Sequence, residues 1–172
     1  MSRRRFTVTT LSAAAVALVT IPPHRTRLIC NVSPSAPVGI YWLTSDAPKY
    51  GNLAVVQLPL ALDMFVDARR YLPRSFLLLK PVAATAGDVV CRVGRRVWIN
   101  RRRSVLVRTA DGLARPLPAW RGCRRLAAGE LFLLSPAPGS YDSRYFGPLE
   151  ARHVIGTAIP IFTLVNRRRE TP

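Results

Sequence analysis

Short apolar runs alternate with turns rich in glycine, proline and aspartate along most of the chain after residue 24. Runs of this length with such turn residues between them are typical of β-strands joined by hairpins. The predicted strands are 39–44, 52–58, 76–83, 89–93, 97–100, 105–109, 131–135 and 154–162. A further hairpin is expected to join 105–109 to Leu113 and Ala114 through a turn at 110–112. The pattern predicts a mainly β protein, a compact antiparallel β domain.

One segment after residue 24 favours a helix instead. Residues 60–71 mix apolar with charged positions, and Pro73 closes the segment because proline cannot continue a helix. No internal repeat is visible, and no linker is long enough to divide this part of the chain.

The N-terminus has a different pattern. Arg3–Arg5 precede an apolar stretch at 6–21, which Pro22 and Pro23 follow. This is the layout of a secretory signal or a short signal anchor. No good cleavage site is present, so we expect an N-terminal membrane-anchor helix in residues 1–24, with the arginines cytoplasmic, and a β domain in 25–172. A cleaved anchor and a buried N-terminal helix are the alternatives.

The charge of the chain is strongly positive, +17 in 172 residues, and 24 of the 26 basic residues are arginine. Such a charge suits nucleic acid or anionic membrane surfaces. The arginines cluster at turns and termini without a basic helix or interleaved aromatic residues. Specific nucleic-acid binding is therefore not expected, and a solvated or lipid-facing basic surface is favoured.

One of only two lysines, Lys80, lies in the apolar run 76–82. A buried ammonium loses hydration, which lowers its pKa, and a neutral amine can act as a general base. Arginine cannot take that role because it stays charged. A lysine that snorkels to solvent at a strand end is the alternative.

The cysteines and histidines give no metal-binding spacing. Cys30, Cys91 and Cys123 lack a C-x-x-C motif, so we predict neither zinc nor another cofactor. In an oxidising compartment Cys91–Cys123 is the more plausible disulfide and Cys30 is left over, although buried free thiols would also fit. His24 and His153 are expected to be surface or structural residues.

The segment 31–41 presents a serine on a stiff backbone. Pro34 and Pro37 restrict the chain on either side of Ser35, which suits a nucleophile. The backbone N–H of Ser35 and the hydroxyl of Ser33 could bind an oxyanion. A stalk between anchor and domain is the alternative reading.

Another polar segment lies late in the chain, at 139–148. Ser140, Asp142 and Arg144 bring a hydroxyl, a carboxylate and a guanidinium together, bounded by glycines. An Asp142–Arg144 ion pair would lock the loop. The alternative is a polar turn without further function.

In this order, the three segments and the anchor resemble the signal peptidase I (S26) superfamily, in particular its conjugative-transfer branch, the TraF-type pilin maturation peptidases. Two stretches match its serine and lysine motifs: Asn31, Ser35, Pro37, Gly39 and Tyr41 in the first, and 79–88 in the second. One departure is Pro81, where ordinary signal peptidases carry arginine, so Asp142 needs another partner, for which Arg144 is available.

The resemblance implies a role for each polar residue. Ser35 would be the nucleophile and Lys80 its general base. Ser140 would orient the lysine amine, Ser33 would donate to the oxyanion, and Asp142 would organise the site with Arg144.

By the same resemblance, the protein would be a membrane-anchored serine endopeptidase that processes, or cyclises, a pilin precursor in conjugation. Its partners would be this precursor or another exported pre-protein and the bacterial inner membrane, with the catalytic domain in the periplasm. The alternatives are a non-enzymatic anchored β-rich subunit of a secretion apparatus and a self-cleaving repressor domain. The anchor and the lack of a helix-turn-helix motif oppose the repressor.

Overall fold

The computed structural model describes residues 27–164. The predicted anchor at 1–24 and His24 lie outside these residues, and the division into anchor and β domain stays a prediction. Within 27–164, no helix is both long enough and apolar enough to cross a membrane.

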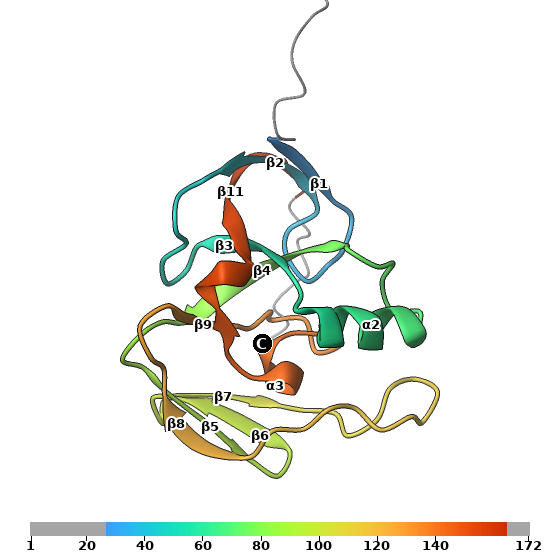
Figure 1. The fold of residues 1–172 in the computed structure, drawn as a ribbon, viewed down its shortest axis with the longest axis vertical. Helices are drawn as coiled ribbons and strands as arrows, with labels where there is room; N and C mark the ends of the chain where they lie inside the picture. Colours follow the sequence, from blue (N-terminus) through green and yellow to red (C-terminus); the bar gives the residue numbers. More distant parts are fainter. Residues whose placement is uncertain (1–26, 165–172) are drawn as a thin grey trace, which may run out of the picture.

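The larger of two antiparallel sheets forms the upper part of the molecule in Figure 1 and has seven strands in the order β1-β2-β11-β3-β4-β9-β10. Their bounds are β1 Leu28–Asn31, β2 Gly39–Thr44, β11 Val154–Thr163, β3 Leu53–Gln57, β4 Leu77–Ala84, β9 Glu130–Leu133 and β10 Leu149–Glu150. Every strand pair in it is antiparallel. The prediction of a mainly β, antiparallel fold is therefore confirmed.

A smaller sheet is inserted between β4 and β9 and lies at the opposite end of the molecule from β1 and β2 (Figure 1). Its strands, in sheet order, are β7 Arg103–Leu106, β6 Arg96–Ile99, β5 Val89–Val93 and β8 Gly122–Arg125. One hydrophobic cluster joins the two sheets, since Ala84 and Phe132 of the larger sheet pack with Val90 and Val97 of the smaller one.

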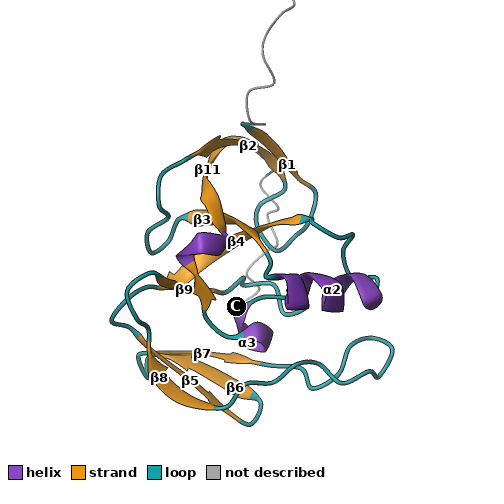
Figure 2. Cartoon of the chain, viewed as in Figure 1, coloured by secondary structure: helices purple, strands orange, loops and turns teal. Residues whose placement is uncertain are grey.

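Helices are few in the described part of the chain (Figure 2). They are α2 Leu60–Ala68, α3 Ser143–Phe146 and the 3-10 turn η1 Ala151–His153. The predicted helix at 60–71 is confirmed but ends earlier, because Arg70 adopts a positive φ of 56° that stops the helix. Val66 and Leu58 pack with Leu78 and Leu133 in a second cluster on the larger sheet.

The hairpin expected through 110–112 is confirmed in part, with a longer turn. Ala110 and Pro116 form an isolated antiparallel bridge, and the Leu117 N–H donates to the Thr109 carbonyl at 2.9 Å. Strand β7 ends at Leu106 and pairs back onto β6, while Leu113 lies in a turn and is 74% exposed. This turn is held by the Asp111 carboxylate, which accepts hydrogen bonds from the backbone N–H groups of Leu113 and Arg115, both at 2.9 Å. The turn therefore spans 111–115, and the return arm begins at Pro116 rather than at Leu113.

Strand β11 approaches β2 more closely than ordinary side chains allow, and two glycines permit it. A Cβ atom added to Gly156 would lie 1.8 Å from the carbonyl oxygen of Thr44, and one added to Gly39 would lie 2.1 Å from that of Phe162. Gly39 belongs to the serine motif. Its role here is to let β11 pass directly beside the end of the serine segment.

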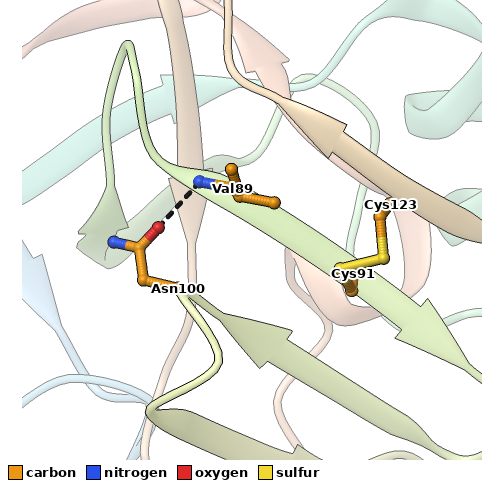
Figure 3. The surroundings of a disulfide bond; sticks show 4 residues. All are labelled: Val89, Cys91, Asn100 and Cys123. Atoms are coloured by element: carbon orange, nitrogen blue, oxygen red, sulfur yellow. Dashed lines mark hydrogen bonds between the residues drawn. A yellow bond between two sulfur atoms is a disulfide. The ribbon is translucent and has the colours of Figure 1, made fainter.

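The predicted disulfide is present. Cys91 and Cys123 lie opposite each other on β5 and β8 and are 32 positions apart in sequence (Figure 3). Nearby, the Asn100 side chain accepts a hydrogen bond from the backbone N–H of Val89 at 2.8 Å, which joins the two strands at the open end of the β5–β6 hairpin (Figure 3). Cys30 is a free, exposed thiol on β1, as the sequence indicates.

Candidate active site

Asn31 and Tyr41 hold the segment 32–38, which we call the serine loop. The Asn31 amide donates to the carbonyl oxygens of Ser33, Ala36 and Pro37 at 2.9, 3.1 and 2.9 Å. The Tyr41 hydroxyl donates to the Pro37 carbonyl at 2.5 Å. These bonds explain why an asparagine and a tyrosine flank the serine in the motif, because they satisfy carbonyls that belong to no strand ladder.

Ser35 is 6% exposed within the serine loop. Its Oγ lies 2.9 Å from the Oγ of Ser33, and its backbone N–H donates to the same oxygen at 3.4 Å. Ser33 is thus directly beside both the hydroxyl and the N–H group of Ser35. An oxyanion formed on a group attached to Ser35 would meet these two donors.

Lys80 lies in β4, inside the larger sheet and opposite Ala54 of β3. Its side chain is 4% exposed, and Nζ donates a hydrogen bond to the Oγ of Ser140 at 2.8 Å. Burial lowers the pKa of Lys80 from 10.5 to about 8, while Asp142 raises it and Arg144 lowers it. The alternative of a lysine that snorkels to solvent is wrong, because Lys80 lies in the middle of β4 with its side chain buried and its amine bonded to Ser140.

The segment 134–142, which we call the second loop, is locked by a buried ion pair. The Arg144 guanidinium donates to both oxygens of Asp142, at 2.7 Å from Nε and 2.9 Å from a terminal nitrogen. Asp142 is fully buried, Arg144 is 2% exposed, and the Asp142 carboxylate also caps α3 by accepting from the Arg144 backbone N–H. The expected Asp142–Arg144 pair is confirmed. Pro81, which replaces the usual arginine, contributes its carbonyl to the Leu134 N–H at 3.0 Å.

Two residues near the site were not identified from the sequence. Ser135, 1% exposed, donates from its hydroxyl to the backbone carbonyl of Ser35 at 2.5 Å. Arg92, 4% exposed on β5, donates to the backbone carbonyl of Arg144 at 2.7 Å and ties the smaller sheet to α3. A cation inside the apolar strand 89–93 was a usable signal for Arg92, of the same kind as for Lys80. Nothing in the local sequence distinguishes Ser135.

The structure brings together the six residues predicted for the site. Ser33 and Ser35 form one group, and Lys80, Ser140, Asp142 and Arg144 form the other. The groups are joined by the Ser135–Ser35 bond and by a hydrophobic cluster in which Ala36, next to Ser35, packs with Leu79, next to Lys80. Within residues 27–164, no hydrogen bond links Ser35 directly to Lys80. His153 lies in η1 and hydrogen-bonds its neighbour Arg152.

Known proteins resemble this chain over most of its length. The family described as signal peptidase, peptidase S26, matches residues 2–163. A plasmid transfer protein TraF of Escherichia coli is 33% identical over 146 residues, which cover 77% of this chain and 81% of the relative. A conjugal transfer protein TraF of Agrobacterium tumefaciens (strain 15955) is 31% identical over 174 residues, covering 94% and 97% of the two chains.

Among solved structures, a signal peptidase I from Enterococcus faecalis V583 matches with a TM-score of 0.39 and 18% identity, over 66% of this chain and 98% of that one. The family match covers nearly the whole chain, and the two TraF relatives exceed 30% identity over at least three quarters of it. The chain therefore belongs to the signal peptidase (S26) family and, within it, to the TraF-type proteins.

Proposed function

We propose that this protein is a serine endopeptidase that uses Ser35 as nucleophile and Lys80 as general base. The observation that carries the proposal is the burial of the Lys80 amine and its hydrogen bond to Ser140. The amine lies in the larger sheet and donates to Ser140 at 2.8 Å, and burial lowers its pKa to about 8. A base with this pKa has a substantial neutral fraction near neutral pH, as general base catalysis requires.

The reaction begins when Ser35 Oγ leaves its hydrogen bond to Ser33 and turns toward Lys80. Neutral Nζ takes the hydroxyl proton while Oγ attacks the scissile carbonyl carbon. The developing oxyanion accepts hydrogen bonds from the Ser35 N–H and the Ser33 hydroxyl. The Lys80 ammonium then returns its proton to the leaving amine, and an acyl-enzyme on Ser35 remains.

The second half of the reaction uses the same groups. Neutral Lys80 takes a proton from an incoming water, or from the amino terminus of the cleaved substrate, which attacks the ester carbonyl. The bond between the carbonyl carbon and Ser35 Oγ then breaks, and the Lys80 ammonium returns the proton to Oγ, which restores both residues. Hydrolysis follows in the first case and cyclisation in the second. Ser140 keeps Nζ directed toward Ser35 throughout, and the Asp142–Arg144 pair holds the loop that carries Ser140.

The substrate class follows from the relatives, which are named as plasmid or conjugal transfer proteins. We assign to this chain the processing of a pilin precursor, or another exported pre-protein, in conjugation. The apolar segment at 6–21 would anchor the enzyme in the bacterial inner membrane with its catalytic domain in the periplasm. An exported substrate would meet the site there.

The proposal is tested by processing of the pilin precursor from the same conjugation system. The full-length Ser35→Ala and Lys80→Ala variants are each expected to lose activity by a factor of about 10³ or more, because the nucleophile and its base act as a unit. Lys80→Arg should be as inactive, since arginine stays protonated. Ser45→Ala and Lys49→Ala, which alter exposed residues, are the matched controls. Maturation by the Ser35 and Lys80 variants at the control rate would favour the non-enzymatic subunit instead.

A further inference from the structure

We propose that Ser135 is a positioning residue that sets the orientation of the nucleophile, an inference that rests on the proposed function. Ser135 follows β9 and is 1% exposed. Its hydroxyl donates to the backbone carbonyl of Ser35 at 2.5 Å, across 100 positions of sequence. It is the one side chain of the second loop with a hydrogen bond to the serine loop in residues 27–164.

The direction of this hydrogen bond follows from a second contact. The backbone N–H of Ala137 donates to the Oγ of Ser135 at 3.1 Å. The hydroxyl oxygen is therefore already an acceptor, and its proton is free to point at the Ser35 carbonyl, which can only accept. Both partners are hydrogen-bonded, and both residues are buried.

The main chain of Ser135 is fastened to the buried ion pair. Its N–H donates to the Asp142 carboxylate at 2.9 Å, and its carbonyl accepts from the Arg144 guanidinium at 2.5 Å. Through its hydroxyl, Ser135 therefore fixes the peptide group that follows Ser35 relative to the Asp142–Arg144 pair. Through Ser140, the same loop holds Lys80. The second loop thus holds both Ser35 and Lys80 by hydrogen bonds, although the two residues come from distant segments.

Loss of this hydroxyl frees the Ser35 carbonyl and lets the serine loop turn relative to Lys80. A displacement of about 1 Å at a reacting atom can cost about 10²-fold in rate. The main-chain bonds of Ser135 to Asp142 and Arg144 do not depend on its side chain. The surroundings that set the protonation of Lys80 are therefore retained when only the hydroxyl is removed.

The test compares full-length Ser135→Ala, Ser135→Cys and Ser135→Thr in processing of the same pilin precursor, per folded protein. We expect the alanine variant to lose about tenfold or more in kcat, with KM and the midpoint of the pH profile unchanged. Cysteine has nearly the same size but is a weak donor and should fall between alanine and wild type. Threonine keeps the hydroxyl and should restore kcat to within about threefold.

Thr157→Val is the matched control. The Thr157 hydroxyl also donates to a distant backbone carbonyl, that of Asp46 at 2.8 Å, but in the loop between β2 and β3. Its loss should lower stability without lowering kcat. Wild-type kcat in both Ser135→Ala and Ser135→Cys would overturn the role of Ser135, as would a shifted pH midpoint in the alanine variant. An inactive wild-type chain would instead contradict the proposed function.

Discussion

Replacement of Lys80 by methionine should make this protein more stable at neutral pH while abolishing its activity. In the unfolded chain Lys80 keeps its proton up to a pKa near 10.5, whereas in the folded protein it loses that proton near pH 8. Each pKa unit is worth about 1.4 kcal/mol. The difference between 10.5 and about 8 therefore corresponds to a penalty of about 3 kcal/mol for carrying the protonated lysine in the folded state below pH 8.

The sign follows from proton binding. Between pH 8 and 10.5 the unfolded chain binds one proton more than the folded protein at Lys80, so the stability of the wild type rises with pH across this window. Methionine has no such proton. It leaves Ser140 without the Nζ donor, which costs about 1 kcal/mol. We expect Lys80→Met to be about 2 kcal/mol more stable than the wild type at pH 6 to 7 and about 1 kcal/mol less stable above pH 10.5, where only the lost hydrogen bond remains.

The assay is chemical unfolding of the full-length chain from pH 6 to 11, followed by tryptophan fluorescence. The quantity of interest is the difference in the free energy of unfolding between variant and wild type, in which the titration of all other groups cancels. Lys49→Met, the same substitution at an exposed lysine, is the matched control. A Lys80→Met difference that does not change with pH would refute the reasoning that burial lowers the pKa of Lys80.

Three further predictions concern the site and the two sheets. The kcat/KM of processing should rise with pH to a plateau with an apparent pKa near 8, as Lys80 loses its proton, and an activity that is constant from pH 6 to 9 would contradict Lys80 as the base. Cys91→Ser with Cys123→Ser opens a disulfide that spans 32 positions and should cost about 4 kcal/mol in unfolding experiments; a cost below about 1 kcal/mol would count against the bond. Gly156→Ala should destabilise by about 3 kcal/mol or prevent folding, because its Cβ would overlap the Thr44 carbonyl, whereas Gly112→Ala, with open space around it, serves as the control in the same thermal unfolding assay.

Local sequence was sufficient for most strands, because alternation and turn residues act over a few positions. It was insufficient where pairing decides the structure. The strands β1 and β8 have four residues each; β8 is exposed at every position and shows no apolar pattern, and β1 is too short to show an alternation. The return arm of the hairpin through 110–112 was predicted too early, because the Asp111 side chain holds Leu113 and Arg115 in the turn and pairing resumes only at Pro116.

Among the site residues, too, some could be identified from local sequence and others could not. Lys80 could be identified from sequence because a lysine inside an apolar strand must lose hydration wherever that strand is buried. Asp142 and Arg144 could be paired because they are two positions apart. Ser135 could not, since its partner is the carbonyl of Ser35, 100 positions away, and backbone carbonyls have no signature in a sequence.

The amino-acid sequence by itself thus determined the β class, the disulfide candidates and the chemistry of the polar residues, since these depend on residue type and near neighbours. Only the tertiary structure decided that the Lys80 amine donates its hydrogen bond to Ser140 rather than to solvent. It also decided that Ser135 and Arg92 donate hydrogen bonds to the backbone carbonyls of Ser35 and Arg144. The physical reason is that burial and hydrogen bonding between distant segments arise when the strands pair. The low pKa of the lysine is a property of that packing.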